Sequence, residues 1–304
     1  MLNRRILRIK AFKTVYSLTE NPSMSLKEAQ MQLERSCEAA RDLYLFLLGL
    51  VPALTREASM RIEAARGKFN PTEEEKHPNM KFAGNRVAPL LAEDPDYTKI
   101  MSRKKLSWGQ YDVLLRHLYD SLRQRGYYAG YMDSGKDSIK EDAGLWKAFF
   151  ENELEDNEEL ERILEDLSVW WNDDLGYALT WCCRTMDDLG RGERWNMPPL
   201  YMSDVTGKEE SDGDFVSRLL RKAFAGYQNY VTRIGEVTPQ WDLGRICATD
   251  LALIVTGLAE ADAFPDIPKK VTINEFVEIS KYYSTPESRA FVNGILDKLI
   301  DKAL

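Results

Sequence analysis

The sequence is poor in cysteine and histidine, which often bind transition metals or, for cysteine, form disulfides. It has four cysteines and two histidines among 304 residues. Cys182 and Cys183 are adjacent, whereas Cys37 and Cys247 are isolated, so the Cys-x-x-Cys spacing of zinc and redox sites is missing. This pattern agrees with a reducing compartment rather than with a disulfide framework. We therefore expect reduced, structural thiols and no cofactor.

Long apolar runs and glycine-rich phosphate loops are missing as well. The longest apolar run, residues 44–54, is far shorter than the roughly 20 residues that a membrane span needs. The basic start of the chain is not followed by the apolar region of a signal peptide. Gly190-Arg191-Gly192 lacks the third glycine and the preceding strand of a dinucleotide fingerprint. We predict a cytoplasmic protein that does not enter a membrane.

No stretch alternates apolar and polar residues over a convincing length, but apolar residues recur at helical spacing and make up much of the 44% apolar content. Near the start, Leu7, Ala11, Val15 and Leu18 form one such stripe. Further helices are predicted for residues 25–51, 57–66, 111–124, 144–155, 158–167, 169–189, 215–230 and 241–263. Residues 69–95 are expected to form a surface loop with short helical pieces at most, and residues 126–135 and 190–213 to be breaks. The sequence predicts an all-α fold.

The last forty residues predict a helical hairpin. Pro265 and Pro268 prevent continuation from upstream, and Thr272 followed by Glu275 has the spacing of a capping box, so a helix is expected to begin near Ile273. Pro286, after two capping residues, suits the first position of a second helix. That second helix has its own apolar stripe, formed by Phe291, Val292, Ile295 and Leu299.

Charge is unevenly distributed along the chain, whose formal net charge is −8. Residues 1–13 contain five basic residues and no acid, whereas residues 151–166 hold nine acids against Arg162 alone. At 100° per residue, Arg4, Arg5 and Arg8 lie within an arc of about 100° on the first helix. A small basic site on an acidic protein fits a selective RNA binder, although an ordinary solvated, basic terminus would have the same pattern.

Two aspartate pairs, Asp173-Asp174 and Asp187-Asp188, lie near several tryptophans in the predicted helix 169–189 and its ends. Paired carboxylates can hold metals or act as acids and bases, but no Glu-x-x-His spacing accompanies them. Solvated acidic faces around a tryptophan-rich core explain the same residues. We interpret this region as non-catalytic.

Two segments of the predicted hairpin have a recognisable order and spacing. Residues 270–275, KVTINE, and residues 291–297, FVNGILD, resemble the C-terminal signature of the NusB family of bacterial transcription antitermination factors. Residues 4–18 resemble the arginine-rich first helix of that family, and residues 214–255 resemble its middle helices more loosely. The resemblance does not extend to the middle of the chain.

The resemblance implies an arrangement of NusB-like helical bundles with a large all-helical insertion. Residues 1–20 and 214–304 would form a NusB-like RNA-binding domain, and residues 21–213 the insertion. Part of residues 25–51 fits the second and third helices of the NusB-like core equally well.

The same resemblance implies a function and a set of site residues. The protein would be a non-enzymatic, RNA-binding antitermination factor that binds the boxA element of ribosomal RNA transcripts, together with the ribosomal protein NusE, in the RNA polymerase antitermination complex. Arg4, Arg5 and Arg8 would hold phosphates or bases, with Tyr16 shaping the site. The hairpin turn would contribute Lys281, Tyr283 and Glu287, although Tyr283 could instead cap the core at a helix end.

Two alternatives belong to other functional classes. In the first, the protein is a protein-only ribosome-assembly adaptor whose insertion has replaced RNA binding. In the second, it is an accessory domain of a ribosomal RNA methyltransferase, because NusB-like domains also occur in such enzymes. The sequence lacks the strand-and-glycine pattern that holds a methyl donor, which argues against the second alternative.

Overall fold

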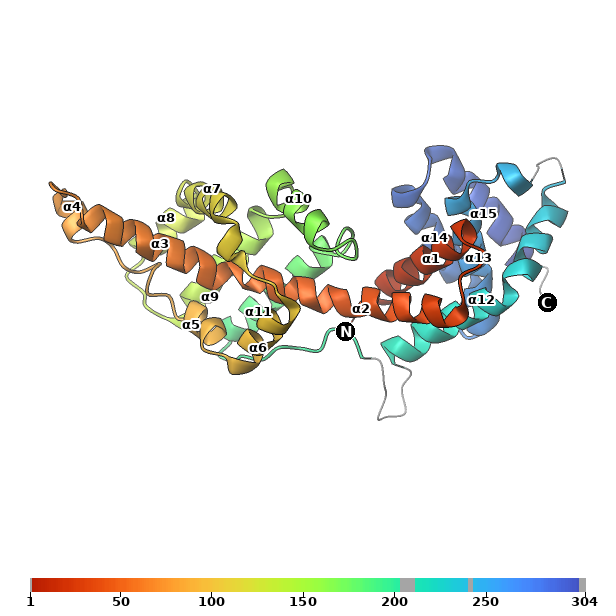
Figure 1. Ribbon diagram of the computed structural model, residues 1–304, viewed down its shortest axis with the longest axis horizontal. Coiled ribbons are helices and arrows are strands. Elements are labelled where there is room, and N and C mark those ends of the chain that lie inside the picture. The colour runs from red at the N-terminus through yellow and green to blue at the C-terminus, as the bar shows by residue number, and fades with distance from the viewer. Residues whose placement is uncertain (1, 203–210, 240–242, 301–304) are drawn as a thin grey trace. The chain divides into compact units, whose positions relative to one another are not determined.

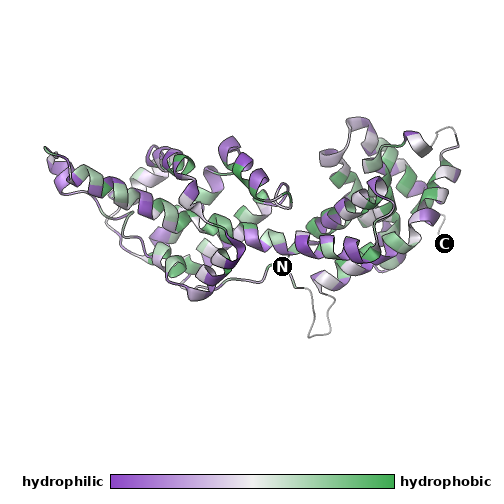
Figure 2. Ribbon diagram, viewed as in Figure 1, coloured by the Kyte–Doolittle hydropathy of each residue, from purple (hydrophilic) through white to green (hydrophobic). Residues whose placement is uncertain are grey.

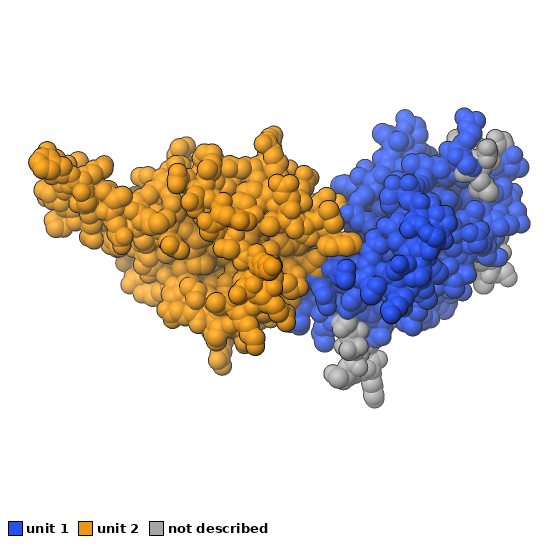
Figure 3. Space-filling model, in the orientation of Figure 1, with its two compact units in different colours: residues 1–38, 199–304 blue, residues 39–198 orange. Residues whose placement is uncertain are grey.

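The computed structural model describes residues 2–202, 211–239 and 243–300, and every regular element within these ranges is helical (Figure 1). The prediction of an all-α fold is therefore confirmed. The chain divides into two compact units, coloured separately in Figure 3. Unit 1 comprises residues 1–38 and 199–304, and unit 2 comprises residues 39–198. Within the described ranges, no helix is both long and apolar enough to cross a bilayer.

Unit 1 is built around α13, a helix that is buried on nearly all sides. Its sequence, ATDLALIVTGLAEADA, is apolar around most of its circumference, as expected for a helix enclosed by others. Four other helices of the unit pack against it. The helices of this unit are α1 (Arg4–Glu20), the first part of α2 (Leu26–Leu48), α12 (Asp212–Val237), α13 (Ala248–Ala263), α14 (Lys269–Tyr283) and α15 (Pro286–Ile300). The predicted stripe on the first helix, from Leu7 to Leu18, is buried.

A glycine in α13 allows the terminal hairpin to come close. A Cβ atom added at Gly257 would lie 2.9 Å from a methyl group of Leu296 in α15 and 3.2 Å from the ring of Phe276 in α14. Both neighbours are fully buried, so they have little room to move. The absence of a side chain at Gly257 therefore determines how closely α14 and α15 pack on the central helix.

Unit 2 has a core rich in aromatic side chains, in which Phe82 contacts Tyr119, Tyr128 and Trp146. Figure 2 shows hydrophobic residues on the helices of both units, interspersed with polar ones as amphipathic packing requires. The elements of this unit, besides the end of α2, are α3 (Leu50–Arg66), α4 (Glu73–Lys76), α5 (Val87–Ala92), α6 (Pro95–Lys104), the 3-10 turn η1 (Trp108–Gln110), α7 (Asp112–Arg123), α8 (Gly126–Asp133), α9 (Ile139–Asn152), α10 (Glu158–Leu167) and α11 (Leu175–Gly190).

Some predicted boundaries agree with the structure and others are corrected by it. The predicted helix 158–167 has the observed bounds of α10, and α15 begins at Pro286 as expected. The predicted break at residues 126–135 is wrong, because α8 forms there despite its two glycines. Its tyrosines explain this result: Tyr128 packs on Phe82, and the Tyr131 hydroxyl donates a 2.6 Å hydrogen bond to Asp142. Tertiary packing thus overrides a weak local preference.

Two other predicted helices begin later than expected. Residues 169–174 form turns, and α11 begins at Leu175. The predicted start of a helix at Trp241 lies outside the described residues, and the next described segment forms a 3-10 turn, η2 (Leu243–Arg245), before α13 begins at Ala248.

Candidate functional site

Arg8 points into unit 1 and forms a bidentate ion pair with Glu260 of α13. Its Nε and Nη2 atoms donate hydrogen bonds of 2.7 and 3.0 Å to the two carboxylate oxygens. The side chains are 5% and 0% exposed. The Thr272 hydroxyl of α14 donates a third hydrogen bond to Glu260, at 2.8 Å. The expectation that three arginines share one exposed face is therefore corrected, because Arg8 belongs to the interior.

Arg5 remains at the surface, where it pairs with Glu275 of α14. Its Nε and Nη2 atoms donate to the carboxylate at 3.0 and 2.8 Å, and about half of the arginine side chain is exposed. This hydrogen bonding lowers the pKa of Glu275 and raises the pKa of Arg5.

Thr272 and Glu275 do not form the predicted capping box, because α14 begins at Lys269 and both side chains bind partners in other helices.

Arg4 turns toward a third helix. Its guanidinium carbon lies 4.0 Å from the centre of the Phe215 ring in α12, a distance typical of a cation–π interaction. The residue itself is exposed. The three neighbouring arginines of α1 thus point to α12, α13 and α14, and Arg5 is the one that faces the terminal hairpin.

The two tyrosines at the end of α14 differ in their surroundings. The Tyr283 ring packs edge-on against Phe12 of α1, with the ring centres 5.3 Å apart, and the Lys13 amine lies 5.4 Å from the Tyr283 ring centre. Tyr282 is 82% exposed. The sequence contained a signal for this difference, because Tyr283 follows the buried Phe276 by seven residues and shares its helical phase. The interpretation of Tyr283 as a core cap agrees with this packing.

The turn between α14 and α15 is held by a buried aspartate from α13. The hydroxyls of Ser284 and Ser288 donate hydrogen bonds of 2.5 and 2.7 Å to the two carboxylate oxygens of Asp250. Because Ser284 follows Tyr283 directly, this arrangement also fixes the end of α14 that presents both tyrosines.

The remaining predicted residues lie at the surface. Tyr16 of α1 is 38% exposed, Lys281 pairs with Glu278 one turn earlier in α14, and Glu287 is exposed in the first turn of α15.

The helices α1 and α14 run in the same direction. An early residue of α1, Arg5, contacts Glu275, and a later one, Phe12, contacts Tyr283 further along α14. We define the α1–α14 surface as the exposed residues Arg5 and Tyr16 of α1 and Tyr282 of α14; Lys281 is exposed on another face of α14, about 120° around the helix from Glu275.

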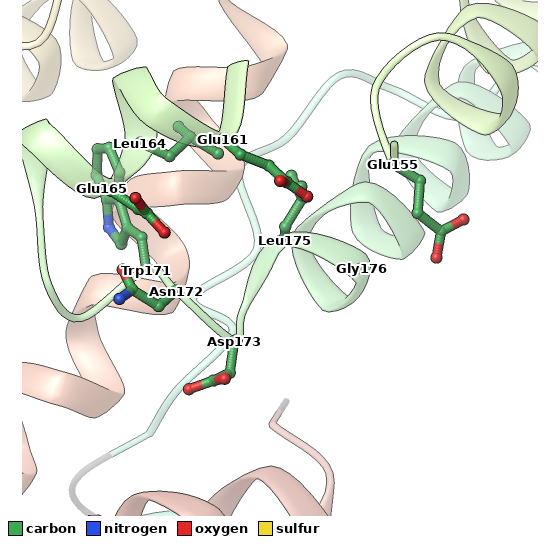
Figure 4. A pocket seen from close by; sticks show the side chains of 9 residues that line it. All are labelled: Glu155, Glu161, Leu164, Glu165, Trp171, Asn172, Asp173, Leu175 and Gly176. Carbon is green, nitrogen blue, oxygen red and sulfur yellow. The ribbon is translucent and has the colours of Figure 1, made fainter. Parts of the chain in front are cut away.

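The acidic region of unit 2 surrounds a hollow of about 330 Å³ between α10 and α11 (Figure 4). Its lining includes the carboxylates of Glu155, Glu161, Glu165 and Asp173, which are spread around the hollow in Figure 4 rather than directed at one point. No cluster of three or more histidine, cysteine, aspartate or glutamate side chains in the described residues could hold a metal ion. Of the second aspartate pair, Asp187 binds Lys147 and Asp188 binds Arg191.

The four cysteines all lie in the described residues, form no disulfide and have different surroundings. Cys37 and Cys182 are buried and Cys183 is half-buried, and burial raises the pKa of both Cys182 and Cys183. Cys247 is exposed just before α13, so the expectation of a structural thiol does not hold for it.

Comparisons with known proteins identify relatives of this chain. A model of the NusB family matches residues 200–301. The transcription antitermination protein NusB of Desulforamulus reducens is 32% identical over 117 residues, which cover 38% of this chain and 79% of the relative. The protein of the same name from Geobacter sulfurreducens is 32% identical over 112 residues, 37% of this chain and 81% of the relative. No solved structure is significantly similar to the chain.

Proposed function

Because the chain belongs to the NusB family, we propose that it is an RNA-binding transcription antitermination factor that binds boxA-type single-stranded RNA of ribosomal RNA transcripts together with the ribosomal protein NusE. The role of this family is transcription antitermination, and the family is not enzymatic. The protein would act in the cytoplasm, within the RNA polymerase antitermination complex.

One observation carries the proposal. Residues 270–275 and 291–297 lie in α14 and α15, and α14 pairs with α1 through Glu275 and the half-exposed Arg5; Tyr16 of α1 and Lys281 and Tyr282 of α14 are exposed as well. This combination of cations and an aromatic ring suits single-stranded RNA, whose phosphates bind cations and whose bases stack on rings. In this proposal unit 1 binds RNA and unit 2 corresponds to the helical insertion.

The distribution of charge supports this division. Unit 2 holds 22 Lys and Arg residues against 29 Asp and Glu residues, whereas unit 1 holds 19 against 20. Most of the net negative charge therefore lies in unit 2, and repulsion of RNA phosphates by unit 1 is small.

The arginines have different roles in this proposal. Arg5 binds a phosphate directly, since half of its side chain is exposed beside the hairpin. Arg8 acts as a positioning residue, because its guanidinium holds α1 against α13 through Glu260. Arg4 extends the basic surface on the side of α12, and Glu287 lies at the start of α15, where it would limit how closely a phosphate approaches.

A salt titration tests the interaction of Arg5 with phosphate. Arg5→Ala should weaken binding to a boxA-type RNA and make the slope of log affinity against log salt concentration shallower by roughly 0.7, the value expected for one phosphate of a single strand. Arg162→Ala, which removes an exposed arginine of unit 2, serves as the matched control and should leave the slope unchanged. An Arg5→Ala slope equal to that of the parent protein would remove Arg5 from the site.

Co-purification separates this proposal from the protein-only adaptor. Capture of NusE and polymerase subunits that depends on intact RNA supports an RNA-binding factor. If the same partners remain after ribonuclease treatment and the purified protein binds no RNA, the adaptor is the correct description.

A further inference from the structure

The exposed Tyr282 lies on the same side of α14 as Glu275, the partner of Arg5. Tyr282 follows Glu275 by seven residues in α14, so two helical turns bring it to the same face of the helix. Arg5 binds Glu275, so its guanidinium lies on the side of α14 that carries Tyr282, about two helical turns away along the axis. An exposed aromatic ring and a surface guanidinium therefore lie on the same side of α14, within the α1–α14 surface.

The pairing of Glu275 allows Arg5 to change partners. Glu275 also lies 3.6 Å from Nη1 of the buried Arg8. If Arg5 turned outward to a phosphate, the Glu275 carboxylate would keep one cation at close range, which reduces the cost of leaving it partly buried. Glu275 thus orients Arg5 in the absence of RNA and allows it to leave for a phosphate.

We propose that Tyr282 is the platform on which a base of single-stranded RNA stacks, while Arg5 exchanges Glu275 for a phosphate of the same strand. This inference rests on the proposed function and assigns the aromatic contact to Tyr282 instead of Tyr283. The Tyr283 ring already packs on Phe12, whereas 82% of Tyr282 is open to solvent. A ring for a base and a guanidinium for a phosphate of the same strand are then supplied from α14 and α1.

The same geometry predicts a preference for single strands. A ring that projects from the end of a helix can stack on a base only if that base is unstacked, and the bases of a duplex already stack on one another. Arg5 recognises phosphate in either form, so the discrimination should come from Tyr282.

The experiment compares variants of the full chain by fluorescence anisotropy, with a labelled single-stranded boxA-type RNA and with the same RNA annealed to its complement. Tyr282→Ala should weaken binding to the single strand by about ten- to hundredfold and alter duplex binding little. Tyr282→Phe should bind the single strand nearly as the parent does, because the ring carries the contact. Phe69→Ala is the matched control, since it removes an aromatic side chain of unit 2 that is 98% exposed.

Several outcomes would overturn the inference. If the parent protein binds the single strand, Arg5→Ala weakens binding and Tyr282→Ala does not, the inference is wrong while the proposed function stands. An equal decrease in affinity for duplex and single strand would also overturn it, because it would exclude base stacking. If the parent binds no RNA at all, the proposed function and this inference fail together. Circular dichroism of each variant establishes that it is folded, as expected for changes at exposed positions.

Discussion

The Arg8 guanidinium and the Glu260 carboxylate form a bidentate ion pair inside unit 1, between residues that are 252 positions apart in sequence. Glu260 is fully buried in α13, where an unpaired charge would be strongly unfavourable. The pair therefore couples the position of α1 to the central helix, and it places Arg5, one turn earlier in α1, beside α14.

Removing one partner of this pair should destabilise the protein more than replacing both. We expect Arg8→Ala to lower the free energy of unfolding by about 3–5 kcal/mol, because it leaves the Glu260 charge buried without its main partner. The double variant Arg8→Met with Glu260→Leu should be destabilised less, since no charge remains buried. Urea unfolding of Arg8→Ala and of the double variant measures their free energies of unfolding. A double variant less stable than Arg8→Ala would contradict this account.

The surface pair should make stability depend on pH in the acid range. Hydrogen bonding to Arg5 lowers the pKa of Glu275 below its usual value of 4.5, so the folded state binds this proton less readily than the unfolded state. The stabilisation is fully present above pH 4.5 and disappears as the pH falls through the lowered pKa.

Arg5→Ala should therefore show a weaker decline in unfolding free energy between about pH 5 and pH 3 than the parent protein. Arg162→Ala, at an exposed position of unit 2, should retain the parent's dependence. Identical pH profiles for the parent and Arg5→Ala would show that this pair does not contribute to acid stability.

Two glycine-to-alanine substitutions should have opposite effects. Gly257→Ala should destabilise the protein by about 1–2 kcal/mol, because overpacking against Leu296 and Phe276 exceeds the gain in helix propensity. Gly294→Ala in the exposed part of α15 should stabilise it by about 0.5–1 kcal/mol, since no atom lies within 4 Å of the added methyl group apart from the adjacent residues and the backbone of α15 itself. Thermal unfolding of both variants tests the packing of the hairpin on α13, and a stabilised Gly257→Ala would contradict it.

The aspartate that holds the hairpin turn should contribute to stability through its two hydroxyl donors. Asp250→Ala leaves Ser284 and Ser288 without their acceptor, and Ser288 is buried, so we expect the free energy of unfolding to fall by about 1–3 kcal/mol. Asp266→Ala, at an exposed position of the same unit, should change stability by less than about 0.5 kcal/mol. Hydrogen exchange of residues 283–288 should accelerate in Asp250→Ala, and unchanged protection there would refute the role of Asp250.

Local sequence signals determined much of the architecture. Helical spacing of apolar residues predicted an all-α fold, the bounds of α10 and the buried stripe of α1, and Pro286 predicted the start of α15. The resemblance to the NusB family, based on residues 270–275 and 291–297, is also confirmed. These features depend on residues within a few helical turns of one another, so the sequence carries them directly.

Tertiary structure decided which of the predicted site residues are available at the surface. Thr272 and Glu275 have the spacing of a capping box, but they bind Glu260 and Arg5 respectively. Arg8 is a residue type that binds phosphate, but it lies in the interior. The partners of Arg5 and Arg8 are 270 and 252 residues away, and no local pattern specifies such pairs. A Glu260 charge left unpaired in the interior would cost more free energy than a helix cap contributes, so Arg8 is held inside while Arg5 stays at the surface, and only the folded protein distinguishes the two.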